Sequence, residues 1–164
     1  MIRNFREVNS IKEANRPAIR LLEPAMTAFP FCLPRIFGNA HFDFFHKSEK
    51  VTLLCFWSTE VEKSLLAVNH LDNWYRESEI GNFEVIAINC DQFKPDSIFN
   101  SARPSGIKML WDQDGLTKNM YKINHFPTTV LIDKFGKIRD EKTGGPLNDW
   151  ARLNLRVASL AAER

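Results

Sequence analysis

The sequence has no paired cysteines. Its 164 residues include only Cys32, Cys55 and Cys90, and no two of these have the spacing of a Cys-x-x-Cys motif. An odd number of widely spaced cysteines argues against a disulfide framework and favours a reducing compartment. The four histidines show no metal-ligand spacing either, so we expect no metal site and no other bound cofactor.

Long apolar runs and strong net charge are also missing. No segment approaches the length of a transmembrane helix. The N-terminus carries Arg3 and Arg6 but no continuous apolar segment, so we expect no signal peptide and a cytoplasmic or other reducing location. A net charge of +2 gives no reason to propose nucleic acid as a partner.

The sequence does contain a short apolar run that leads directly into an amphipathic helix. Residues 51–57, VTLLCFW, have the length and composition of a buried strand. Thr59 and Glu62 fit a capping box, and apolar residues then recur at helical spacing, at Val61, Leu65, Val68, Leu71 and Tyr75. The junction should therefore present free backbone N–H groups and the positive end of a helix dipole.

Strands and helices alternate along the rest of the chain. We expect a hairpin at 31–45 around Gly38-Asn39, and further strands at 83–89, 107–111, 128–132 and 137–143. Helices are expected at 60–76, at 95–102, at 115–123 and after 144–146. This order predicts an α/β fold with a central mixed sheet flanked by helices.

The first 29 residues are interpreted as an N-terminal arm in front of one domain at 30–164. Pro17 and Pro24 limit any helix there to short pieces. The arm either packs loosely on its own domain or docks on a partner, for which its basic residues would suit.

Two segments resemble thioredoxin-like proteins, especially the redoxins and the thioredoxins of cytochrome c maturation. The sequence FWSTEVEKS at 56–64 is similar to their FWATWCPPC segment, and HFPTTVLIDKFGKI at 125–138 is similar to their pattern GVxGxPTTFLIDxxGxI. The resemblance covers about residues 30–162 and implies a thioredoxin-like fold. It also implies a cis peptide bond before Pro127, and it places Val61 and Ser64 where those proteins have the attacking and resolving cysteines.

Dithiol exchange requires a thiolate and a resolving thiol. Valine and serine supply neither, and Glu60 and Glu62 add negative charge where a thiolate would form. The sequence therefore favours a non-catalytic protein-binding module that acts as an adaptor, a chaperone-like factor or a subunit of a larger assembly. The resemblance implies a binding groove around Trp57, Val61, Phe126 and Pro127, used by strand addition.

The alternative is a thiol oxidoreductase or peroxidase that uses a single cysteine. Cys90 follows the strand at 83–89, at the functional edge of an open α/β sheet, and is the candidate reactive thiol. Cys55 lies within a strand and Cys32 within the hairpin, where we expect both to be packing residues.

Overall fold

The computed structural model describes residues 26–45, 48–99, 103–144 and 149–164. Its centre is a mixed five-stranded sheet in the order β5-β4-β3-β6-β7, formed by Val51–Trp57 (β3), Phe83–Asn89 (β4), Lys108–Trp111 (β5), Thr128–Ile132 (β6) and Ile138–Thr143 (β7). The first three of these strands are parallel, whereas β6 and β7 are antiparallel to their neighbours. The predicted mixed sheet is confirmed.

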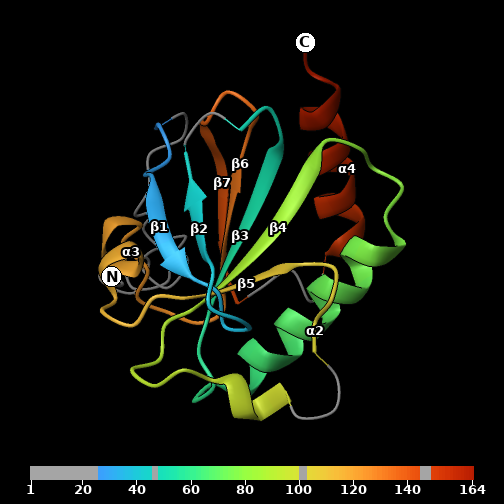
Figure 1. The fold of residues 1–164 in the computed structure, drawn as a ribbon. Coiled ribbons are helices and arrows are strands. Elements are labelled where there is room, and N and C mark those ends of the chain that lie inside the picture. The colour runs from blue at the N-terminus through green and yellow to red at the C-terminus, as the bar shows by residue number, and fades with distance from the viewer. Residues whose placement is uncertain (1–25, 46–47, 100–102, 145–148) are drawn as a thin grey trace, which may run out of the picture.

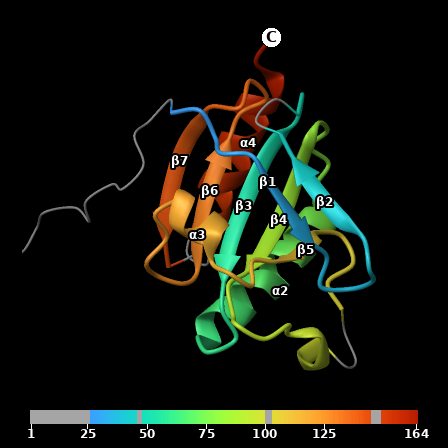
Figure 2. The ribbon, with the colours of Figure 1, turned by 60° about the vertical axis from the view of Figure 1, so that its left-hand side comes forward.

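Helices cover one face of this sheet and a hairpin covers most of the other (Figures 1 and 2). Helices α2 (Glu62–Glu77) and α4 (Trp150–Ala162) pack on the first face. The hairpin of β1 (Phe31–Pro34) and β2 (His41–Phe44), together with α3 (Leu116–Met120), lies on the second. The hairpin predicted at 31–45 is therefore confirmed.

The two hydrophobic cores follow from side-chain alternation along β3. Leu53, Cys55 and Trp57 point toward α2 and α4, whereas Leu54 and Phe56 point toward the hairpin side. Successive residues of a strand face opposite sides of a sheet, and β3 is the middle strand of five. A fully apolar strand is therefore what a sheet buried on both faces requires.

The short helices differ from the prediction. Residues 95–102 were expected to form a helix, but only a 3-10 turn at Asp96–Phe99 is present among the described residues there. Helix α3 has five residues rather than the nine predicted at 115–123. The positive φ of Gly115 (65°) places that residue in the left-handed region immediately before α3, which a right-handed helix cannot include, so the helix begins at Leu116. None of the helices in the described parts of the chain is long and apolar enough to cross a membrane.

The last residues of the predicted N-terminal arm contact the domain predicted at 30–164. Backbone hydrogen bonds join Ala28 to Gly136 and Ile138 to Met26, both at 2.8 Å, so this segment is bound to the β6–β7 turn. The Tyr121 hydroxyl donates to the carbonyl of Phe29 at 2.8 Å. Residues 26–29 are thus bound to the folded domain, and the remainder of the predicted arm lies outside the described residues.

Candidate binding site at the start of helix α2

Three loops meet at one edge of the sheet. The β3–α2 loop follows Trp57, and the loop after β4 begins at Cys90. The register pairs Trp57 with Asn89, and Phe56 with Thr128 of the antiparallel strand β6. The segment that precedes β6, residues 125–127, therefore lies at the same edge, beside the start of the β3–α2 loop.

Asp91 fixes the shape of the β3–α2 loop. Its carboxylate accepts hydrogen bonds from the Ser58 hydroxyl (2.6 Å), the Thr59 N–H (3.0 Å) and the Asn89 side-chain amide (2.9 Å). Partial burial acts to raise the pKa of Asp91, but the bonds from Ser58, Asn89 and Thr59 outweigh it and the pKa is lowered. The Trp111 indole also donates to the Asp91 carbonyl at 2.8 Å. One anionic side chain thus ties the ends of β3 and β4 together.

The predicted capping box at Thr59 and Glu62 is wrong. Helix α2 begins at Glu62, its N-cap is Val61, and no side chain caps it. The Thr59 N–H is already bonded to Asp91, and the Glu60 N–H is bonded to the Ser58 hydroxyl at 3.2 Å. The helix begins later than predicted because a side chain distant in sequence binds the loop first.

Val61 and Ser64 occupy different environments. Val61 is partly exposed, whereas Ser64 is fully buried on the inner face of α2. The Ser64 hydroxyl has no hydrogen-bond partner among the described residues. Only Val61 of this pair can therefore contact a bound partner.

Trp57 does not line a surface, contrary to the prediction. Its side chain is fully buried, and its ring lies edge-on to that of Phe99 with 5.8 Å between ring centroids. The end of β3 faces α2 at this position, which turns the indole inward. Trp57 therefore packs in the core beneath the site and cannot contact a bound partner.

The segment before β6 provides the other wall. The Phe126–Pro127 peptide bond is cis, as the resemblance implies. Pro127 is buried and its carbonyl accepts from the Gly144 N–H at 2.7 Å, whereas Phe126 is partly exposed. The backbone N–H and C=O groups of Phe126 are hydrogen-bonded to no other described residue.

Sequence reasoning missed two residues of this edge. Phe93, two residues beyond Asp91, is 79% exposed and is the most exposed large apolar side chain of the described residues. Asp91 was not singled out from the sequence. Its partner Ser58 is 33 residues away, and no local pattern reveals such a pair.

None of the three cysteines is placed as an activated thiol. Burial is the main cause that raises the pKa of Cys90, with the charge of Asp112 second, and burial alone raises that of Cys55 to about 12. Cys32 is exposed rather than packed, contrary to the prediction, and its pKa is raised chiefly by a hydrogen bond with Asp43. Among the described residues, no group of His, Cys, Asp and Glu side chains could hold a metal ion.

Comparison with known proteins identifies the family. A family described as thioredoxin-like matches residues 49–138, which is more than half of the chain. The chain belongs to this thioredoxin-like family. The match includes β3, the start of α2 and the Phe126–Pro127 segment, so it contains all three loops of the candidate site.

Solved structures of similar fold include bacterial thiol-disulfide proteins. One, described as the thiol:disulfide interchange protein DsbE of Chlorobium tepidum, is 25% identical with a TM-score of 0.67, and the match covers 84% of this chain and 98% of that one. The exposed lipoprotein thioredoxin Etrx1 of Streptococcus pneumoniae is 19% identical, with a TM-score of 0.65 and coverage of 78% and 98%. A thiol-disulfide oxidoreductase of Bacteroides fragilis is 22% identical, with a TM-score of 0.63 and coverage of 79% and 99%. A search of curated proteins found no match.

Proposed function

We propose that this protein is a non-catalytic thioredoxin-like module that binds protein partners, as an adaptor, a chaperone-like factor or a subunit of a larger assembly. One observation carries the proposal: the start of α2 contains no thiol, because Val61 and the buried Ser64 stand at the two positions where a reactive cysteine pair would be needed. Without a nucleophilic sulfur, neither disulfide reduction nor disulfide formation can begin there.

The alternative of an enzyme that uses Cys90 finds no supporting observation. Burial raises the pKa of Cys90, so its sulfur is a neutral thiol near neutral pH, and the thiol rather than the thiolate is a poor nucleophile. Its sulfur also lies 3.6 Å from the carbonyl oxygen of Ile88, within reach as a weak donor. We therefore assign Cys90 a packing role.

The proposed binding surface differs from the groove that the resemblance implies. It consists of Val61, Phe93 and the backbone and ring of Phe126, with Trp57 and Pro127 beneath them. The N–H and C=O groups of Phe126, which bind no other described residue, suit main-chain pairing with an extended segment, and the exposed apolar side chains suit its alternate residues. Residues 1–25 remain a proposed second contact. Three unpaired cysteines support a reducing compartment.

Binding is tested with an unfolded ligand, a reduced and alkylated model protein that cannot fold, which is titrated into this protein. In an NMR titration, we expect shifts at Val61, Phe93 and Phe126. Substituting Phe93→Asp or Phe126→Asp should weaken the interaction about tenfold or more, because each places a charge in an apolar contact. Phe135→Asp is the matched control, since Phe135 is 49% exposed but lies in the β6–β7 turn. Equal weakening by all three variants would refute the assigned surface.

The absence of catalysis is tested separately, with the wild-type chain and cysteine variants. The wild type should not accelerate reduction of insulin disulfides by dithiothreitol. The double variant Val61→Cys with Ser64→Cys should gain weak activity, because residues three apart share one helix face and the helix N-terminus favours a thiolate. Val61→Cys alone is the control, since it lacks a resolving thiol. Wild-type activity that disappears in Cys90→Ser would instead establish the single-cysteine enzyme.

A further inference from the structure

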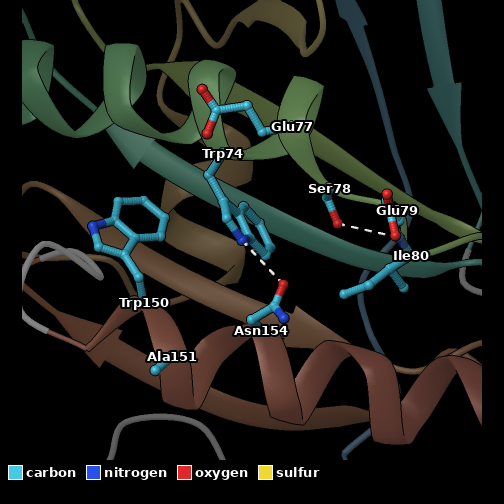
Figure 3. A pocket seen from close by; sticks show the side chains of 8 residues that line it. All are labelled: Trp74, Glu77, Ser78, Glu79, Ile80, Trp150, Ala151 and Asn154. Carbon is cyan, nitrogen blue, oxygen red and sulfur yellow. Dashed lines mark hydrogen bonds between the residues drawn. The ribbon is translucent and has the colours of Figure 1, made fainter.

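The concave surface between the last turn of α2 and the first turns of α4 is lined by aromatic side chains that already have partners (Figure 3). The rings of Trp74 and Trp150 lie with their centroids 5.7 Å apart, and His70 lies edge-on to Trp150. The Trp74 indole N–H donates to the Asn154 side-chain oxygen at 3.3 Å. This surface therefore joins the two helices to each other.

The hairpin of β1 and β2, by contrast, has unpaired backbone groups along β2. The Arg35 N–H donates to the Ala40 carbonyl at 2.9 Å, and in an antiparallel pair every second residue is hydrogen-bonded to the neighbouring strand in this way. The backbone groups of Phe42 therefore point toward β1, and those of His41 and Asp43 point away from it. No described residue binds these outward N–H and C=O groups, so β2 presents an open strand edge (Figure 2).

The side chains beside this open edge are a hydrogen-bond donor and an acceptor. His41 and Asp43 are both exposed, and residues two apart on a strand lie on the same face. The imidazole of His41 has no partner among the described residues. The Asp43 carboxylate forms a hydrogen bond with the Cys32 thiol, and its two oxygens have further lone pairs that can accept. The edge therefore carries complementary groups two residues apart.

We propose that two copies of the chain pair through the open edge of β2, antiparallel about a two-fold axis at Phe42. His41 of one protomer then lies opposite Asp43 of its partner, and the same contact recurs by symmetry. Both residue pairs exchange backbone hydrogen bonds, and each imidazole N–H donates to the facing carboxylate. The exposed side chain of Phe45 lies diagonally opposite the partner's His41, within reach of an aromatic ring. The product is a four-stranded antiparallel sheet made of two hairpins.

Charge selects this register and this strand. Centring the axis on Asp43 instead places the two Asp43 carboxylates opposite each other, which is destabilising. Strand β7 has the same conflict, since a two-fold pairing centred on any residue of 139–142 places a charge opposite its own copy. The edge of β5 is partly occupied, because the Ile36 N–H donates to the Met109 carbonyl at 2.9 Å. Among these three strand edges of the described residues, that of β2 is therefore the best suited to self-pairing.

Sedimentation equilibrium of the full chain tests the association. The interface is small, so we expect a dissociation constant of about 0.1 mM, measured over about 0.01–1 mM protein. A reductant is present, because oxidation of the exposed Cys32 would link two copies by a different bond. In hydrogen-exchange NMR, the amides of His41 and Asp43 should exchange about fivefold more slowly at the highest concentration, where about a fifth of the chains remain monomeric. The amide of Phe42, already bonded to β1, should change little.

Charge variants test the register. His41→Asp places two carboxylates opposite each other at both residue pairs and should weaken dimerisation about tenfold or more. The double variant His41→Asp with Asp43→His exchanges the two groups, so a histidine again faces an aspartate, and its dissociation constant should lie within about threefold of the wild type. His70→Asp is the matched control, since His70 is exposed but lies on α2. None of these residues belongs to the proposed binding surface, so the result is independent of the proposed function.

Four outcomes would overturn the proposal. Absence of association at about 1 mM protein would show that the edge of β2 stays unpaired. Equal weakening by His41→Asp and His70→Asp would show a general effect of charge. A double variant that associates no more tightly than His41→Asp would exclude the register at Phe42. Association without slower exchange at His41 and Asp43 would place the interface elsewhere on the protein.

Discussion

Asp91 shows how much one carboxylate can organise at the residue scale. It binds the hydroxyl of Ser58, the backbone of Thr59 and the amide of Asn89, and so connects two loops that local sequence patterns treat as independent. Substituting Asp91→Asn replaces one carboxylate oxygen by an NH₂ group, which then faces the N–H or O–H donors of Ser58, Thr59 and Asn89. We expect a loss of about 1–2 kcal/mol in the free energy of unfolding at neutral pH, measured by chemical denaturation. Asp114→Asn, an exposed turn residue, should cost almost nothing.

The difference in the free energy of unfolding between wild type and Asp91→Asn should depend on pH. The pKa of Asp91 is lower in the folded state than its ordinary value, which is about 3.9 in an unfolded chain. The stabilisation is therefore complete above about pH 4 and is lost as the pH falls through the folded pKa. The gap between wild type and Asp91→Asn should narrow below about pH 4. A gap that is constant across that range would mean that the charge of Asp91 has no role.

The three cysteines should differ in their rates of alkylation. Cys32 is exposed, whereas Cys55 is fully buried and Cys90 is partly buried. With iodoacetamide and mass spectrometry, Cys32 should be modified first, Cys90 much more slowly because it is a partly buried neutral thiol, and Cys55 only after unfolding. A Cys32→Ser variant should then show almost no labelling in the native state. Native labelling of Cys90 as fast as that of Cys32 would contradict its assignment as a packing residue.

At the scale of elements, sequence reasoning succeeds where the signal is local. The bounds of β3, β4 and β6 agree with the predicted strands, because each is a short segment rich in β-branched and aromatic residues. A tight turn joins β6 to β7, with Gly136 at a φ of 77°. Sequence reasoning fails where a residue distant in sequence determines the local structure. The start of α2 depends on Asp91, and the inward side chain of Trp57 depends on the face of the sheet against which α2 packs.

The β6–β7 turn should be sensitive to loss of a single side chain. Asp133 is only 3% exposed, and its carboxylate accepts from the N–H groups of Phe135 (2.9 Å) and Lys137 (2.8 Å) and from the guanidinium of Arg139 (2.9 Å). Arg139 is also paired with Glu163 after α4 at 3.1 Å. Substituting Asp133→Ala should lower the free energy of unfolding by about 3 kcal/mol, because buried donors lose their acceptor.

Thermal denaturation measures this effect, with Asp114→Ala as the control in a different turn. A loss of that size corresponds to about 6–12 °C in the melting temperature for a chain of this length. A loss no larger than that of the control would show that the turn is held by its backbone alone.

At the scale of the whole molecule, the true start of the domain can be measured by deletion. Removing residues 1–25 leaves every described contact in place and should change the melting temperature by no more than about 2 °C. Removing residues 1–29 also removes the buried Ala28, the backbone bonds to the β6–β7 turn and the Tyr121–Phe29 hydrogen bond. That deletion should lower the melting temperature by several degrees. Equal effects of both deletions would place the boundary elsewhere.

The path of residues 26–36 has a consequence for how the five-stranded sheet avoids self-association. This segment pairs with the β7 side of the sheet at Thr27 and Lys137, crosses one face, and pairs with β5 at Arg35 and Leu110 (Figure 2). Both outermost strands are thus partly covered by the same stretch of chain, and the rest of β7, RDEKT, is dominated by charged residues. Exposed strand edges are templates for aggregation, and covering or charging them blocks it. These features hinder sideways growth of the sheet. Under the proposed function, the backbone of Phe126, which is bonded to no other described residue, is the place where an incoming strand would add.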